Sequence, residues 1–239
     1  MKVGQKALLF ISVLFLLTIF SPYSVPGSVV SAASDTPQDI IAGTIEALRD
    51  MDTSLDSSVF RRVLRRAQGV AIFPSVTEIA LLGVGGMSGN GLVLRKDRDT
   101  GVWYGPAFLK ISTLGVGARV GIQNLDLLLV INDSDGLGAF MKKTFKFGGT
   151  LAWTVGPIGR SVSAEIDSEL TAPIYSYSIA KGLYFDAGSL EGSTIKDHSS
   201  ANTAFWGEEI SNKIILEERR VINTEVMKIC NYIDNMGTD

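Results

Sequence analysis

Apolar side chains recur at helical spacing over residues 35–67. They are Ile41, Ile45, Leu48 and Met51, followed by Val59, Val63 and Leu64. Positions three or four apart share one face of an α-helix, so the spacing predicts two amphipathic helices. The polar stretch at residues 52–54 separates them, and Asp56 or Ser57 is expected to cap the second helix.

Residues 69–192 change to short apolar runs separated by turn residues, a pattern typical of β-strands. The runs are residues 70–73, 92–95, 108–111, 125–131, 151–155 and 174–177, and 20 of the 25 glycines fall in this part. A hairpin turn at residues 97–101 and few intervening helices favour antiparallel pairing. Only one short helix is expected here, starting at residues 132–133 and containing Leu137, Phe140 and Met141. We therefore predict an α+β fold: a strongly curved, mainly antiparallel, glycine-rich β-sheet, or partial barrel, with N-terminal helices and a C-terminal amphipathic helix.

Helical spacing returns from about residue 208. Ile215, Ile222, Ile229 and Met236 are seven positions apart, with charged residues on the other faces. The pattern favours an amphipathic helix packed on its own sheet. A seam for a partner helix, in a homo-oligomer or with another protein, is the alternative. We expect residues 34–210 to form the main domain and residues 211–239 a C-terminal helix that packs on it or extends it.

The first 33 residues have the pattern of a secretory signal. Lys2 and Lys6 precede an apolar run over residues 7–20, and Ser31-Ala32-Ala33 supplies small residues for cleavage. An uncleaved anchor is the alternative, although the run is short for a membrane span. We expect export to the periplasm or the medium, with the protein peripheral on a membrane.

Charge argues against a nucleic-acid-binding protein, and cysteine content excludes a fold held together by internal disulfides. Without Lys2 and Lys6, 20 basic residues remain against 25 acids, which argues against general nucleic-acid binding. Cys230 is the only cysteine, so no internal disulfide forms, and its apolar neighbours indicate a core residue.

Several catalytic patterns occur in the wrong context. Gly85, Gly89 and Gly91 match a dinucleotide loop, but a strand follows them where such a loop needs a helix. Tyr177 and Lys181 match the dehydrogenase pair but lie in a strand-like stretch. His198, the only histidine, is expected in a solvated loop, and one histidine with one cysteine does not make a zinc site. We predict no enzyme activity, cofactor or metal, and we interpret the glycines as strand and turn positions that permit close backbone approach.

The central motifs resemble those of SYLF domains, in order and over residues 38–210. They are residues 67–74, the glycine stretch, residues 103–107, 156–160, 175–183 and 189–193, with Asn202 and residues 205–207 at the end. The usual Ser-Lys-Gly is Ala180-Lys181-Gly182 here, and Asp186 is a second departure. The resemblance implies lipid binding: eukaryotic members bind phosphoinositides, and some bind and bundle actin. For an exported, bacterial-type member it implies binding of anionic phospholipid or of a membrane surface.

Three groups of cations are candidate headgroup ligands. Arg61, Arg62, Arg65 and Arg66 share one broad helix face, with apolar residues between them as an interfacial side. Lys142, Lys143 and Lys146 form a second group, and Arg160 lies in a glycine-proline turn. The alternatives are a solvated arginine face whose apolar side enters the core, and a structural ion pair for Arg160. A scaffold or stress-related module that recruits proteins through its C-terminal helix is the competing function.

Overall fold

The computed structural model describes residues 36–55, 58–81, 84–116, 121–148, 151–156, 171–180, 183–185 and 190–238. Residues Asp35–Asp239 form one compact unit. The predicted signal segment, Asp56, Ser57, Arg160 and Lys181 lie outside the described residues.

The chain begins with two helices and continues into a sheet. The helices are α2 (Pro37–Ser54), α3 (Ser58–Arg65), α4 (Ser134–Phe140), α5 (Ser199–Trp206), α6 (Asn212–Glu218) and α7 (Thr224–Thr238). The strands are β1 (Gly69–Leu81), β2 (Val84–Lys96), β3 (Trp103–Val116), β4 (Gly121–Ile131), β5 (Thr144–Lys146), β6 (Thr154–Val155), β7 (Ile174–Ala180), β8 (Leu183–Phe185) and β9 (Thr194–Asp197). Helix α2 starts at Pro37 because Thr36 caps it and Pro37 occupies its first turn.

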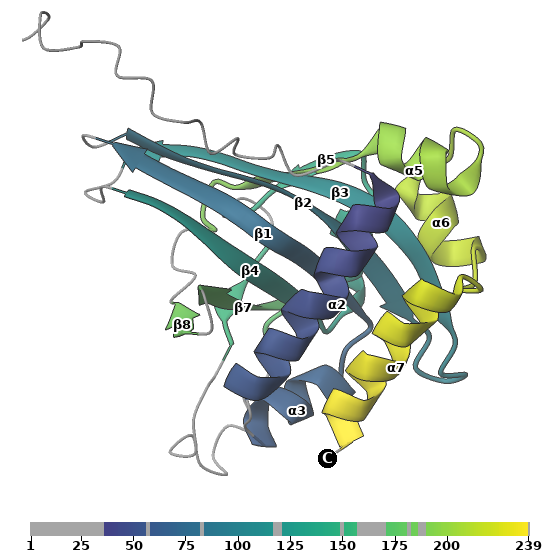
Figure 1. The fold of residues 1–239 in the computed structure, drawn as a ribbon. Helices are drawn as coiled ribbons and strands as arrows, with labels where there is room; N and C mark the ends of the chain where they lie inside the picture. The colour runs from purple at the N-terminus through teal and green to yellow at the C-terminus, as the bar shows by residue number, and fades with distance from the viewer. Residues whose placement is uncertain are drawn as a thin grey trace, which may run out of the picture. The chain divides into compact units, whose positions relative to one another are not determined.

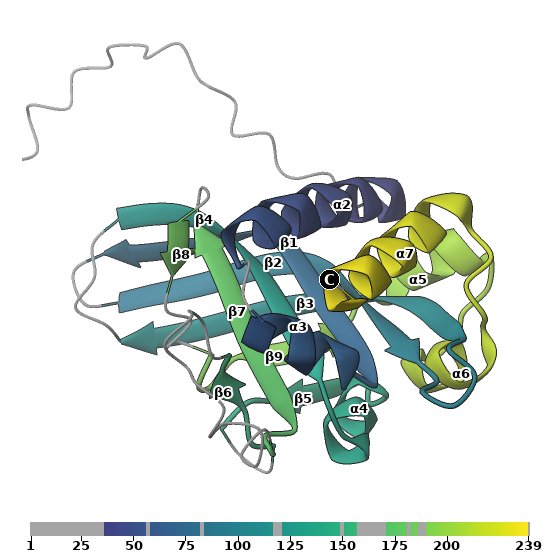
Figure 2. The same cartoon turned by 90° about the horizontal axis from the view of Figure 1, so that it is seen from below.

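Among the described residues, nine strands form one curled sheet (Figures 1 and 2). Their order is β5-β9-β3-β2-β1-β4-β7-β6, with β8 paired to β7, and all pairs are antiparallel except β6 with β7. A bulge in β1 lies where Ser75 takes a positive φ of 55°. Bulges bend strands, so this one adds to the curl. The predicted α+β fold with a strongly curved antiparallel sheet is confirmed.

Both faces of the central sheet are buried, each against a different part of the chain. Val70 and Ile72 of β1 point to the face covered by α2, α3 and α7. Ala71 and Phe73 point into the curl, where α4 and α6 contribute to the second core. Alternate residues of a strand face opposite sides, so β1 carries apolar residues at successive positions here.

The C-terminal heptad pattern does not form one helix. Arg219 and Val221 instead bond the backbone of β3: Gly105 N donates to Arg219 O at 2.8 Å and Val221 N to Trp103 O at 2.9 Å. These bonds replace helical ones, so α6 ends at Glu218 and a new helix, α7, starts at Thr224. Ile222 lies between the two helices and is 81% exposed. Ile215, Ile229 and Met236 are buried within the domain. The C-terminal residues therefore pack on the domain, and the buried side chains of Ile215, Ile229 and Met236 are not available as a partner seam.

The structure tests the predicted environments of two side chains, Cys230 and His198. Cys230 is a core residue as predicted, and burial raises the pKa of its thiol to about 12. The prediction of a solvated loop for His198 was wrong. Its side chain is 3% exposed, and Nδ1 accepts a bond from Ala201 N at the start of α5. Helix α5 was not predicted because polar residues surround this cap, and the neighbouring β9 was not predicted either.

Candidate functional site

The helical layer leaves one part of the sheet uncovered. Figure 1 shows one end of each of β1–β4 extending past α2. On this open face, strand pairing arranges side chains in three rows, each crossing several strands. We refer to these as the apolar, hydroxyl and lysine rows, in order from the hairpin ends inward.

The apolar row lies closest to the hairpin ends. It runs Ile122, Ile79, Gly86, Leu114 across β4, β1, β2 and β3. Ile79 is 50% exposed, Ile122 74% and Leu114 92%. Gly86 leaves room for the Leu114 side chain, since a Cβ there would lie 3.4 Å from Leu114 Cδ2. Ile122 and Ile79 lie directly opposite each other, and Leu114 follows one strand further on, beyond Gly86, so the three exposed apolar side chains share one row.

The hydroxyl row comes next and spans six strands. It runs Asn124, Thr77, Ser88, Ser112, Thr194 and Lys146 across β4, β1, β2, β3, β9 and β5. Thr77 Oγ1 donates to Asn124 Oδ1 at 2.9 Å. A groove of about 590 Å³ is lined by residues of this row and of the apolar row, together with Met87, Thr113 and Gly192.

The lysine row completes the face. It runs Asn90, Lys110, Lys196 and Thr144 across β2, β3, β9 and β5, so the two lysines lie directly opposite each other. Both are exposed, as is Lys146 at the end of the hydroxyl row. Like charges in directly opposed positions destabilise a sheet. No described residue forms a salt bridge with Lys110, Lys146 or Lys196, and none of the three rows contains a carboxylate. The arrangement therefore fits an external anion.

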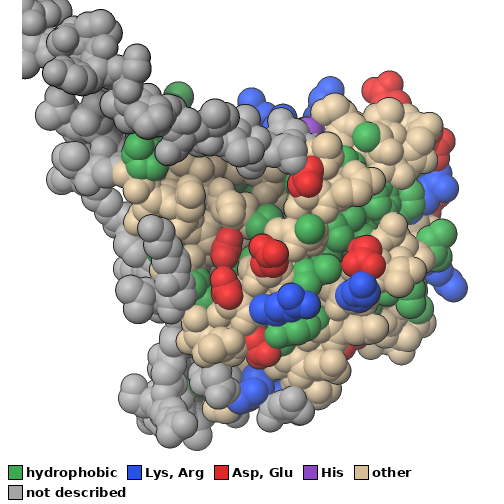
Figure 3. Space-filling view, viewed as in Figure 1, with side chains coloured by type: hydrophobic (Ala, Val, Ile, Leu, Met, Phe, Trp, Pro, Cys, Tyr) green, Lys and Arg blue, Asp and Glu red, His purple; other side chains and the backbone are tan. Residues whose placement is uncertain are grey.

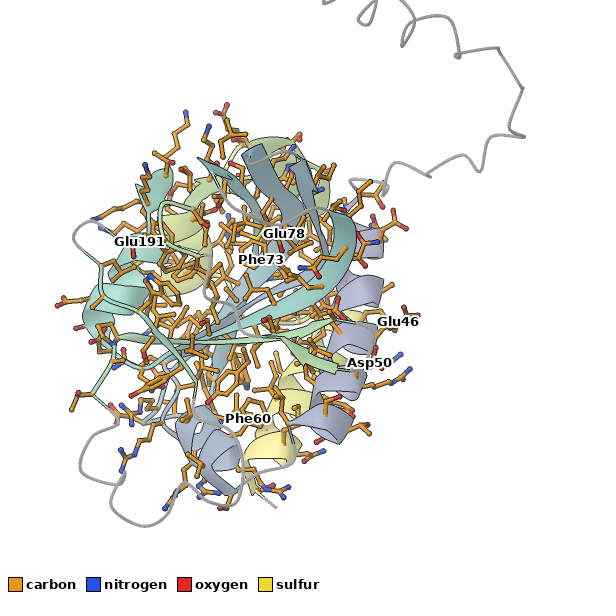
Figure 4. The ribbon with its side chains drawn as sticks, turned by 90° about the vertical axis from the view of Figure 1, so that its left-hand side faces the viewer. Glu46, Asp50, Phe60, Phe73, Glu78 and Glu191 are labelled. Carbon is orange, nitrogen blue, oxygen red and sulfur yellow. The ribbon has the colours of Figure 1, made fainter. Side chains whose placement is uncertain are left out.

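Acidic residues border the open face along α2. Asp126 of β4 accepts a hydrogen bond from Ser75 N at 2.8 Å. Burial nevertheless raises its pKa, with Asp50 and Glu46 of α2 adding to the effect. Figure 4 labels Glu46 and Asp50 on this helix, and Figure 3 shows acidic side chains over it. Helix α2 thus separates the open face from the elements beyond it.

The predicted arginine group lies away from the open face. Helix α3 follows the end of α2 at the bottom of Figure 1, whereas the hairpin ends lie at the upper left. Arg61 and Arg62 are half-buried, Arg65 and Arg66 are exposed, and Arg65 Nη1 donates to Gly237 O at 2.8 Å.

The apolar side of α3 is not an interfacial surface. Its members Val59, Phe60, Val63 and Leu64 are all buried in the core. Because core packing already uses these residues, the prediction that they give an interfacial helix its apolar side was wrong. The alternative, a basic face whose apolar side enters the core, describes this helix.

The predicted lysines are divided between two places. Lys142 and Lys143 are exposed just after α4, and Lys143 lines a pocket of about 380 Å³ with Asp197 and Glu209. Lys146 lies on β5 and belongs to the open face. Lys110 and Lys196 were not predicted as site residues, because both lie in strands whose pairing partners cannot be identified from the sequence.

The motif residues carry structural roles. Asn202 is fully buried and bonds both backbone groups of Phe108, as well as Asp197 and Asn212. Gly156 packs under the Tyr177 ring, where an added Cβ would lie 2.0 Å from the ring. Within the glycine stretch, Gly89 and Gly91 of β2 pack against β1, as the prediction of close backbone approach required. These motifs hold the fold together, and Gly91 continues into a strand and not into a helix.

Comparisons with known proteins agree with these motifs. The family described as "Ysc84: Las17-binding protein actin regulator" matches residues 112–236. The chain is 34% identical over 160 residues to "LAS seventeen-binding protein 3" of Saccharomyces cerevisiae, covering 66% of this chain and 34% of the relative. It is 32% identical over 156 residues to human "SH3 domain-containing YSC84-like protein 1", covering 65% and 44%. The chain thus spans a third to just under half of the length of these relatives. No helix among the described residues is long and apolar enough to cross a membrane. The fold motifs and the family match together show that the chain belongs to the Ysc84, or SYLF, domain family.

Proposed function

We propose that this protein is a non-enzymatic module that binds anionic lipid headgroups at a membrane surface. The observation that carries the proposal is the open face, on which Lys110, Lys146 and Lys196 lie together without an ion-pair partner among the described residues. An ammonium group near an anionic lipid surface contributes about 1 kcal/mol. Clustering lets the face attract lipid phosphates although the chain's net charge is −3.

The other predicted cations are proposed as additional headgroup ligands, on α3 and just after α4. Arg65, Arg66, Lys142 and Lys143 are exposed, and Arg61 and Arg62 add to the positive charge of α3. Because α3 lies apart from the open face, its arginines form a separate contact, which we expect to be weaker. Arg160, which lies outside the described residues, is a further proposed headgroup ligand.

Residues 1–33 are proposed to direct export, so that the domain meets lipid in the periplasm or outside the cell. Mass analysis of the protein recovered from its native envelope or medium tests this, since cleavage before Ser34 removes the segment. A mature protein that retains residues 1–33 would contradict it.

Protein recruitment is the competing function. The name of the yeast relative records binding to LAS seventeen, and this chain exposes Ile214, Ile222 and Met227 on or beside its C-terminal helices. Light scattering over a range of concentrations tests self-association, because pairing through these exposed side chains would give a mass that rises with concentration.

The main test is sedimentation of residues 35–239 with neutral and anionic liposomes at low and high salt. We expect binding to anionic vesicles that weakens at high salt, because counterions screen exposed charges. The variant Lys110→Gln/Lys146→Gln/Lys196→Gln is expected to bind on the order of 100-fold more weakly, at about 1 kcal/mol per lysine.

The matched control is Arg98→Gln/Lys213→Gln/Lys228→Gln, which removes three exposed cations from other surfaces. Both variants change the net charge equally, so the control should bind nearly as well as the parent. Equal losses in both variants would show that overall charge, and not the open face, governs binding.

A further inference from the structure

Asp126 lies on β4 at the edge of the part of the sheet that α2 covers. Alternate residues of a strand share one face. Two positions along β4, Leu128 is buried in the core beneath the helices, whereas Asn124, two positions the other way, is exposed on the open face. The half-buried carboxyl group of Asp126 therefore lies at the boundary between the covered and open parts of the sheet.

The bulge of β1 lies directly opposite Asp126. The register of β1 with β4 shifts between Phe73 and Val76, so that Pro74 and Ser75 together face Asp126. Bulges leave backbone groups outside the regular ladder. Here Ser75 N donates to Asp126 Oδ1 at 2.8 Å in place of a ladder bond. The carboxyl group thus takes part in holding the bend of β1.

Helix α2 packs on the same bulge and brings two further acids to it. A Cβ added at Gly43 would lie 3.2 Å from the Pro74 side chain, so the helix approaches the bulge closely here. Glu46 and Asp50 follow Gly43 by three and seven positions and share its side of the helix (Figure 4). The contact between α2 and the bulge is therefore flanked by acids on the helix and on β4.

The charged groups that act on Asp126 have its own sign. Among the described residues they are the two acids of α2, whereas Arg49 of the same helix acts on the Tyr232 phenol of α7. The two strands paired with β4 carry no charge at this position, since the opposite residues are those of the bulge and Ile179 of β7. An ionised Asp126 is therefore partly removed from water beside like charges, which disfavours that form.

We propose that Asp126 is a pH-sensitive switch in the contact between α2 and the bulge of β1. While its carboxyl group is neutral, α2 packs on the bulge without repulsion from it. When the group ionises, the carboxylates on the two sides of the contact repel one another, and α2 is held less firmly. The switch goes beyond lipid binding and does not depend on it.

The direction of the pH dependence follows from the surroundings of the carboxyl group. Burial raises the pKa of Asp126, the hydrogen bond from Ser75 N opposes this, and Asp50 and Glu46 raise the pKa further. Because the pKa in the folded state lies above the ordinary value of 3.8, protonation stabilises the fold. This stabilisation is complete below that ordinary value and is lost as the pH rises through the raised pKa.

Thermal unfolding of residues 35–239 between pH 4 and pH 7.5 tests the switch with the variant Asp126→Asn. Asparagine keeps an acceptor for Ser75 N and cannot ionise. We expect the variant to melt close to the parent at pH 4 and a few degrees above it at pH 7. The control Asp99→Asn changes an exposed acid in the turn after β2 and should show no comparable gain. A difference between Asp126→Asn and the parent that does not grow with pH would overturn the proposal.

The variant Glu46→Gln/Asp50→Asn tests the part played by α2 without changing Asp126. Both side chains are exposed, so the fold should persist. Without these acids the pKa of Asp126 should fall, and the loss of stability with rising pH should be smaller and occur at lower pH than in the parent. An unchanged pH dependence would remove α2 from the switch and contradict the proposal.

Hydrogen exchange at pH 7 tests whether the effect is local to the contact. Amides of α2 should exchange several-fold more slowly in Asp126→Asn than in the parent, because opening of this helix should become rarer. Helix α6, which packs on β3, provides the reference and should change less. Equal slowing in α2 and α6 would indicate a general gain in stability and would refute a switch at this contact.

Discussion

Replacing Gly91 by alanine should destabilise the domain by about 3 kcal/mol, which is large for a single methyl group. A Cβ at this position would lie 2.3 Å from Ile72 O and 2.5 Å from the Phe73 ring. Neither neighbour can move easily, because Ile72 is paired in the sheet and Phe73 is fully buried. Thermal unfolding by circular dichroism should show a melting temperature lower by roughly 10 °C.

Gly138→Ala provides the matched control for this change. Gly138 lies in α4, and an added Cβ would meet nothing within 4 Å. Alanine favours a helix over glycine by about 0.5–1 kcal/mol, so this variant should melt at the same or a higher temperature. If Gly91→Ala melts like Gly138→Ala, the close approach of β2 to β1 does not constrain the sheet.

Removing the side chain of Asn202 should have the second large effect. Asn202 Oδ1 accepts from Phe108 N at 2.7 Å, and Nδ2 donates to Phe108 O, Asp197 Oδ1 and Asn212 Oδ1. Alanine leaves these groups without this partner in a buried site, where each unsatisfied group costs about 1–3 kcal/mol. We expect Asn202→Ala to lower the free energy of unfolding by about 3–5 kcal/mol, measured by urea denaturation.

Two further substitutions distinguish the loss of the Asn202 hydrogen bonds from a general effect on helix α5. Thr203→Ala changes the exposed neighbour on α5 and should alter stability by less than about 0.5 kcal/mol. Asn202→Asp keeps the acceptor for Phe108 N but loses the donor and places a second carboxylate beside Asp197. It should therefore be less stable than the parent, and a stability equal to that of the parent would mean that the donor bonds of Asn202 contribute nothing.

Local pattern was sufficient to predict the kinds of element and much of their order. The spacing of Ile41 and Leu48 predicted α2, and the run at residues 125–131 predicted the buried part of β4. Strand lengths were underestimated because glycines and hydroxyl residues in the hairpin ends carry no apolar signal. The interrupted C-terminal helix was missed because its break depends on β3, more than 100 residues earlier, through bonds to Trp103 and Gly105.

Less of the candidate site than of the fold could be predicted from the sequence. The arginines of α3 are adjacent in the sequence and therefore conspicuous, whereas Lys110, Lys146 and Lys196 come together only through the register of β3, β9 and β5. Lys110, Ser112 and Leu114 alternate along β3, but the pattern of one strand does not show which residues on other strands share its face. Burial of Val63 and Leu64 likewise depends on packing against the rest of the core.

The central claim is that the open face, and not α3, holds the protein to lipid. Its most direct test compares anionic-liposome binding of Lys110→Gln/Lys146→Gln/Lys196→Gln with that of Arg61→Gln/Arg62→Gln/Arg65→Gln/Arg66→Gln at low salt. We predict that the lysine variant loses most binding and that the arginine variant keeps most of it, although it loses one more charge. Strong loss in the arginine variant with full binding by the lysine variant would contradict the claim.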